Sequence, residues 1–110
     1  MKEVIFNRKD YKSYKDFYHD LCVKLNKDRF IDWRGEYENL GFNADLLNEF
    51  LWYCHDDNLH IKMLNFDTEK ISKKKTYEDY KWNLIIEVLN YFALTYSNNK
   101  LEYINEKDEK

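Results

Sequence analysis

The chain has 110 residues, a length that supports one domain with one hydrophobic core. Its 18 basic and 21 acidic side chains give a formal net charge of -3, and its 44% hydrophobic and 18% aromatic residues exclude a disordered chain. With two glycines, no proline and two cysteines, it cannot contain the glycine-rich loops that bind nucleotide phosphates, or an all-cysteine zinc site.

The first predicted elements are a strand and a helix. A Val-Ile-Phe run within residues 3–7 indicates a short strand. Ser13 and Asp16 then form a capping box, and the apolar spacing that follows predicts an amphipathic helix over residues 14–26. Residues 27–42 contain both glycines and are expected to be irregular.

A second helix is predicted over residues 44–55, with Asn43 as its N-cap. Its buried stripe is expected to consist of Leu46, Leu47, Phe50, Leu51 and Cys54. The alternation that follows indicates a strand over residues 59–65. Residues 70–75 are expected to be a polar loop with solvated lysines.

Another capping box, from Thr76 to Asp79, predicts a third helix that runs to about Tyr96. The side chains expected on its buried stripe are Tyr77, Leu84, Ile85, Val88, Leu89 and Phe92. The dipeptide Asn98-Asn99 is expected to end this helix in a left-handed turn, and residues 100–104 to form the last strand.

This order of elements predicts an α/β fold with a small three-stranded parallel sheet, packed with three to four helices through right-handed crossovers. Residues 1–104 are expected to form the single domain, and residues 105–110 a charged tail. The apolar runs are too short for a signal peptide or a membrane span, so a cytoplasmic protein without a membrane partner is expected. Cys22 and Cys54 are then expected to be reduced thiols in the core.

Charge is distributed unevenly along the chain. Residues 35–61 contain no Lys or Arg and carry a net charge of -6, whereas residues 1–34 carry +3 and residues 62–110 are neutral. Such a segment is a poor surface for nucleic acid and suits a basic protein partner. The alternative is an acidic face that only keeps the protein soluble.

The second predicted helix should present a distinctive outer face. If its apolar residues point inward, the outward residues are Asp45, Asn48, Glu49 and Trp52. Asp45 and Glu49 are one turn apart with like charge, which costs a few tenths of a kcal/mol on an isolated helix. A carboxylate pair beside an exposed aromatic ring is typical of an interface that binds another protein.

Residues 41–51 carry a family resemblance. The sequence there reads Gly41-Phe42-Asn43-Ala44-Asp45-Leu46-Leu47, followed by Asn48, Glu49 and Leu51. It resembles the barstar family pattern G-x-N-x-D-x-L-x-D-x-L, with Glu49 in place of the second Asp. The predicted order of elements over about residues 2–104 is also similar to that of the family.

This resemblance implies a barstar-like fold and an intracellular inhibitor of a secreted, barnase-like ribonuclease, in an immunity or antitoxin role. It implies a 1:1 protein complex, no enzymatic activity, and no cofactor or metal. Glu49 would take the place of a substrate phosphate, Asp45 would add a second carboxylate, and Gly41 would let the backbone approach closely. The partner-binding residues expected on this basis are Asp45, Glu49, Asn48, Trp52, Gly41, Asn39 and Phe42.

The sequence departs from the family pattern at several positions. Asn39, Leu40 and Asn48 stand where the family commonly has aromatic residues, and Trp33, Tyr37 and Phe42 are the candidates to replace them. The family's third helix adds an acidic contact, but the nearest positions here are Phe92 and Ala93.

Three other interpretations remain open on the residues alone. One is a general acidic interaction module with a partner that is not a nuclease. Another is a small hydrolase that uses Asp45, Glu49 and a histidine. The third is a metal site built from residues close in sequence, with a polar loop as its alternative; these residues are Cys54, His55, Asp56, Asp57 and His60.

Overall fold

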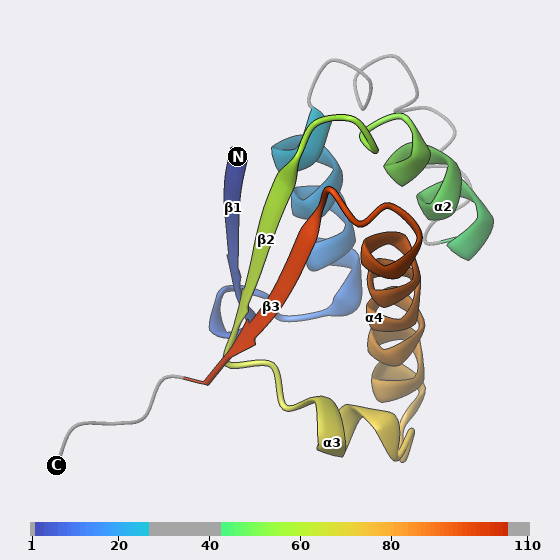
Figure 1. Ribbon diagram of the computed structural model, residues 1–110. Helices are drawn as coiled ribbons and strands as arrows, with labels where there is room; N and C mark the ends of the chain where they lie inside the picture. The colour runs from blue at the N-terminus through green and yellow to red at the C-terminus, as the bar shows by residue number, and fades with distance from the viewer. Residues whose placement is uncertain (1, 27–42, 106–110) are drawn as a thin grey trace, which may run out of the picture.

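The computed structural model describes residues 2–26 and 43–105 (Figure 1). Three strands and four α-helices make up the described part, and they form the α/β fold that the sequence predicts. In chain order the elements are β1 (Lys2–Asn7), a short 3-10 helix (Arg8–Asp10), a first helix over residues 14–26, α2 (Ala44–Trp52), β2 (Leu59–Leu64), α3 (Thr68–Ser72), α4 (Tyr77–Thr95) and β3 (Lys100–Ile104).

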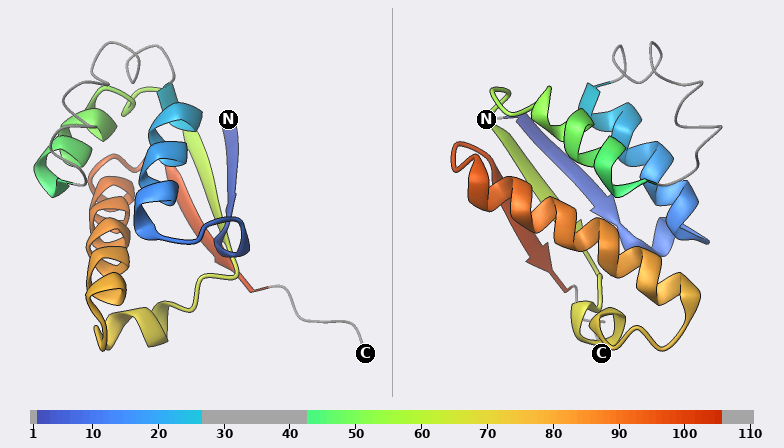
Figure 2. Two further views of the ribbon diagram at one scale, coloured as in Figure 1. Left: turned by 180° about the vertical axis from the view of Figure 1, so that it is seen from behind. Right: turned by 90° about the vertical axis from the view of Figure 1, so that its right-hand side faces the viewer.

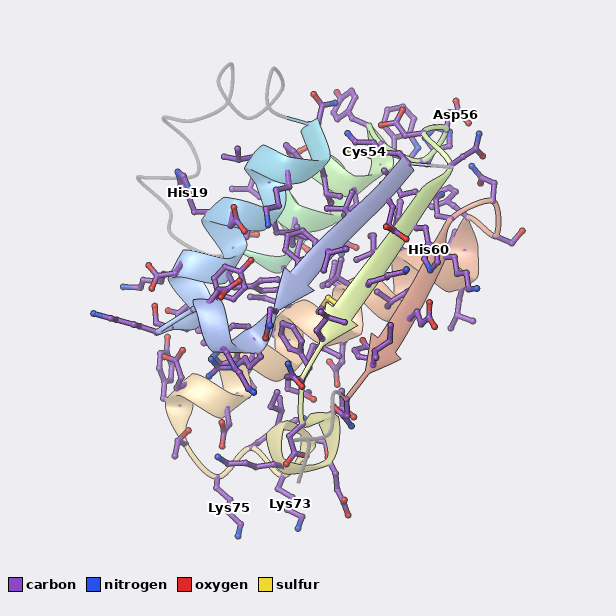
Figure 3. The ribbon with its side chains drawn as sticks, turned by 90° about the vertical axis from the view of Figure 1, so that its left-hand side faces the viewer. His19, Cys54, Asp56, His60, Lys73 and Lys75 are labelled. Atoms are coloured by element: carbon purple, nitrogen blue, oxygen red, sulfur yellow. The ribbon has the colours of Figure 1, made fainter. Side chains whose placement is uncertain are left out.

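The three strands form one parallel sheet in the order β1-β2-β3. Val4 is opposite Ile61, and Ile61 is opposite Leu101, so these residues lie in one row on the covered face. The first helix, α2 and α4 all lie on this face (Figure 2). In the described part of the chain no helix covers the other face, which is turned toward the viewer in Figure 3.

An aromatic cluster forms the centre of the core between the sheet and the helices. The Phe17 ring stacks on Trp82 with a centroid distance of 5.2 Å and meets Phe6 edge-on at 5.3 Å. Phe66 completes the cluster at 5.7 Å from Trp82. All four side chains are almost completely buried, so α4 and the first helix are held together by large apolar contacts.

The predicted buried stripe of α4 is partly wrong. Tyr77 is 68% exposed and Leu84 is only half-buried, whereas Trp82 and Ile86, which were not expected on the stripe, are buried. The buried face is centred on residues 82, 85, 89 and 92, which are three or four positions apart. Tyr77 lies five positions before Trp82 and therefore falls outside this spacing.

The predicted polar loop at residues 70–75 is also wrong in part, because α3 occupies Thr68–Ser72. The Asp67 side chain accepts a hydrogen bond from the Lys70 amide and caps this helix. Ile71 is buried at 5% exposure, which holds the turn against the core. The lysines at positions 73–75 are exposed, as expected.

The second helix ends at Trp52 rather than near residue 55. The amides of Cys54 and His55 bond three residues back, to Leu51 and Trp52, and tighten the chain into a turn. Cys54 is still buried in the core, as is Cys22, and neither cysteine is in a disulfide. Burial raises the pKa of the Cys22 thiol far above its ordinary value.

No helix in residues 2–26 and 43–105 combines the length and apolar character needed to cross a membrane.

Candidate partner-binding surface

The orientation of α2 follows from its cap and its apolar side. The Asn43 side chain accepts hydrogen bonds from the amides of Asp45 and Leu46 at 2.8 and 3.1 Å, which satisfies two free donors of the first turn. Burial of the opposite side against the core then fixes the rotation of the helix, since Leu47, Phe50 and Leu51 are at most 1% exposed. The residues expected to face outward, namely Asp45, Asn48, Glu49 and Trp52, are all exposed.

Asp45 and Glu49 form an acidic pair on this outer face. Within the described part of the chain, neither carboxylate forms an ion pair or accepts a hydrogen bond from another group. No Lys or Arg occurs between Asn43 and Ile61. Two neighbouring carboxylates on a fixed helix create a local negative potential that attracts cationic groups.

A groove runs between α2 and α4 beside this pair. It consists of two hollows of about 260 and 230 Å³ that share Asn48 and Tyr91, and we refer to it as the α2–α4 groove. Each hollow is smaller than the roughly 300–1,000 Å³ typical of sites for drug-sized ligands, so each fits a protein side chain better. The lining residues are Ala44, Asn48, Glu49, Leu51 and Trp52 from α2, and Leu84, Glu87, Val88, Tyr91, Phe92 and Tyr96 from α4 or its C-cap.

The residues of α4 in this groove were not predicted from the sequence. Tyr91 is 64% exposed on the α4 side of the groove, and Glu87 places a carboxylate there, where it accepts a hydrogen bond from the Asn83 amide at 2.9 Å. Phe92, where an acidic contact was considered, is instead a buried part of the floor. A signal was present, since Glu87 and Tyr91 lie one helical turn apart on the side of α4 away from its buried stripe.

Hydrogen bonds connect the turn after α2 to the turn after α4. Asn99, which is 4% exposed, donates from its side-chain amide to the backbone carbonyls of His55 and Tyr96. Asn98 also donates to the carbonyl of His55, at 2.8 Å. These bonds fix the C-terminal end of α2 relative to α4 and hold the groove in one shape.

The predicted left-handed turn at residues 98–99 is therefore wrong. Among the described residues the non-glycine positions with positive φ are Asn58, Asn65 and Lys74. Asn99 ends α4 in another way, because its backbone amide and its side-chain amide both donate to the Tyr96 carbonyl. The side-chain amides of Asn98 and Asn99 also donate to the His55 carbonyl in the neighbouring turn.

The residues considered for a metal site are not brought together. Cys54 is buried and its thiol donates to the Phe50 carbonyl, whereas His60 lies on the open face of the sheet and pairs with Glu102 at 2.9 Å (Figure 3). Asp56 and Asp57 are exposed in the turn before β2. Within the described ranges, no three His, Cys, Asp or Glu side chains are placed to hold a metal ion.

Several residues of the sequence hypothesis, including the predicted binding residues Asn39, Gly41 and Phe42, lie outside the described residues. The same holds for Trp33 and Tyr37, the other candidates to replace the family's aromatic contacts. No family model matches the chain, and no curated protein and no solved structure matches it either. The surface formed by α2 and the α2–α4 groove is therefore interpreted from its own geometry and charge.

Proposed function

We propose that this protein is a barstar-like inhibitor of a basic, secreted ribonuclease, and that the outer face of α2 enters the nuclease's substrate site. The observation that carries the proposal is the pair Asp45 and Glu49, exposed one turn apart on a capped helix with no cation paired to them among the described residues. The sequence of residues 41–51 resembles the barstar pattern, and this resemblance is the reason for proposing that family and a ribonuclease as the target.

The chemistry of such a complex is simple. A ribonuclease site is built to hold phosphate through basic side chains and hydrogen-bond donors. A carboxylate held rigidly at the phosphate position forms charge-assisted hydrogen bonds with the same groups and blocks the substrate. Because the Asn43 cap and the buried side of α2 already fix the helix backbone that carries Glu49, no backbone entropy is lost at this position on binding.

The surroundings of the acidic pair support a protein partner. Trp52 is 49% exposed and, with Tyr91 across the groove, offers aromatic surface next to the carboxylates. Exposed aromatic rings beside charged groups are enriched where binding energy is concentrated. The acidic stretch 43–61 would also speed the encounter with a basic enzyme, and added salt would slow it.

The test is inhibition of a basic, barnase-like ribonuclease by the wild type and by Asp45→Asn, Glu49→Gln and the double variant. Each single change removes a charge while keeping the shape, and should weaken inhibition about 10- to 100-fold, as expected for a lost charge-assisted hydrogen bond. Glu69→Gln on α3 is the matched control, because it removes an exposed carboxylate away from α2 and should inhibit as the wild type does. Inhibition that does not change in the double variant contradicts the proposal.

A general acidic interaction module is the second candidate, and the aromatic α2–α4 groove is the observation that favours it, since such a groove suits many basic partners. The Asp45 and Glu49 variants also distinguish the inhibitor from the general module. A general module would bind a basic protein through Asp45 and Glu49 without reducing any ribonuclease activity. An inhibitor in an immunity role would also protect cells that express the nuclease, and the double variant would not.

A further inference from the structure

The His55 side chain lies between two aromatic walls of the α2–α4 groove. Its ring stacks on Trp52 with a centroid distance of 5.4 Å and an interplanar angle of 27°. The ring of Tyr96, the C-cap of α4, also lies 5.0 Å from it, at 42°. Trp52 and Tyr96 both line the groove, so the imidazole joins the end of α2 to the end of α4 behind the surface that a partner would touch.

One hydrogen bond and one charged contact hold the imidazole in this place. The Nδ1 atom lies within hydrogen-bond distance of the Trp52 carbonyl, one of the open carbonyls at the C-terminal end of α2. The Nε2 atom lies 3.3 Å from a carboxylate oxygen of Asp56. The backbone carbonyl of His55 accepts from Asn98 and Asn99, so both the ring and the backbone of this residue are held.

We infer that His55 is a positioning residue of the binding surface: it holds Trp52 and Tyr96 as the aromatic wall of the groove and couples that wall to the protonation of its own ring. The coupling within the free protein stands on the contacts above. Its consequence for binding rests on the proposed function.

Protonation changes the contacts that the ring makes. A neutral imidazole has one N–H, which Nδ1 can donate to the Trp52 carbonyl, whereas the imidazolium can make the same bond and also places a positive charge 3.3 Å from the Asp56 carboxylate and against the Trp52 ring. The titratable groups that contact the ring in the described structure are the Asp56 carboxylate and the Tyr96 phenol, and the other contacts, Trp52, Asn98 and Asn99, are neutral.

Protonation also changes the charge of the surface. It places a positive charge beside Trp52, on a face that also carries the carboxylates of Asp45, Glu49 and Glu87. A basic partner is then attracted less strongly. One unit charge several ångströms away in water changes affinity by about threefold, and that is the expected loss as the pH falls through the range in which histidines titrate.

The first experiment uses the free protein and needs no partner. Tryptophan fluorescence is recorded from about pH 8 to about pH 5, the range in which histidine changes charge. An imidazolium stacked on an indole quenches its emission, so the wild type should lose intensity on acidification. The loss should be absent from His55→Gln and Trp52→Phe, and should persist in the matched controls His19→Gln and His60→Gln. Quenching that persists in His55→Gln overturns the inference.

A second variant, His55→Phe, keeps the test valid if His55→Gln does not fold. His55→Phe keeps an aromatic ring between Trp52 and Tyr96 but cannot take a proton, so it should fold, bind and show no quenching. The binding arm then compares wild type and His55→Gln at about pH 7.5 and about pH 5.5, on either side of histidine's ordinary range, against one purified basic ribonuclease that the wild type inhibits.

The wild type should lose about threefold more affinity than His55→Gln over this interval, because titration of the nuclease is common to both and cancels. Equal losses overturn the link between His55 and binding. If no basic ribonuclease is inhibited at any pH, the proposed function fails, while the fluorescence result for the free protein still decides the contact between His55 and Trp52.

Discussion

The side-chain oxygen of Asn99 accepts a hydrogen bond from the backbone amide of Leu59 at 2.8 Å, across 40 positions of the chain. Leu59 is the first residue of the central strand β2, and Asn99 comes immediately before β3. With its amide group also bonded to His55 and Tyr96, this one buried side chain joins β2, the turn after α2 and the end of α4.

Asn99→Ala should be among the most destabilising single polar substitutions in the described structure. It leaves the amide of Leu59 buried without a partner and removes one of the two donors to each of the His55 and Tyr96 carbonyls. The expected loss in unfolding free energy is about 2–3 kcal/mol, measured by urea denaturation. Asn98→Ala is the control, because Asn98 is exposed and should cost less than about 1 kcal/mol. Equal losses in the two variants would contradict this role of Asn99.

Asn43→Ala should lower both stability and partner binding. Loss of the cap of α2 costs about 1 kcal/mol, and it loosens the first turn, which carries Asp45. Thr76→Ala provides a matched comparison, because Thr76 caps α4 through the amide of Asp79 at 3.0 Å. It should cost a similar amount of stability in thermal unfolding and leave ribonuclease inhibition unchanged. If both cap variants inhibit equally well, the order of the first turn of α2 does not matter for binding.

Tyr91→Ala should weaken partner binding by about tenfold with little change in stability. The Tyr91 ring is largely exposed, so its loss opens no cavity in the core, but it removes one side of the α2–α4 groove. Tyr77→Ala removes a ring of the same kind and similar exposure from the other end of α4. Titration calorimetry against the inhibited nuclease should show a greater loss of affinity for Tyr91→Ala than for Tyr77→Ala. A greater loss for Tyr77→Ala would mean that the interface lies outside the groove.

Acid should destabilise the open face of the sheet. A hydrogen bond and ion pair with Lys62 hold the pKa of Glu3 below its ordinary value, and the hydrogen bond from His60 does the same for the pKa of Glu102. Because both folded pKa values lie below the unfolded ones, the contribution is complete above about pH 4.5 and is lost as the pH falls through the folded values. Both carboxylates are exposed, so the effect is modest.

The corresponding measurement is the urea midpoint at about pH 6 and about pH 3, on either side of the carboxyl titrations. The Glu3→Gln, Glu102→Gln double variant should lose less stability over this interval than the wild type does. Glu69→Gln again serves as a control, because the carboxylate of Glu69 lies in α3 and not in the sheet. A double variant with the full acid sensitivity of the wild type would place that sensitivity elsewhere.

The outer face of α2 could be predicted because its determinants are local. Asn43 supplies the cap, and the spacing of Leu47, Phe50 and Leu51 fixes which side is buried. The parallel sheet was predictable for a similar reason, since each strand is separated from the next by a helix and right-handed crossovers then bring the strands side by side.

What was missed depends on contacts between distant segments. The position of Tyr91 beside Asn48 follows from the way in which α4 packs on α2, and no local pattern contains that information. The short helix α3 depends on burial of one residue, Ile71, against the rest of the fold. The role of Asn99 depends on groups about 40 positions away, and its sequence neighbourhood resembles any turn that is rich in asparagine.

The arrangement of all three long helices on one side of the sheet has a practical consequence (Figure 2). Side chains on the uncovered side, such as Lys100, stand on the layer opposite α2 and can be changed without touching the helices. A cysteine introduced there, with the two natural thiols buried, would accept a dye or a surface linker selectively. The molecule could then be immobilised by its sheet on a biosensor with α2 directed into the solution.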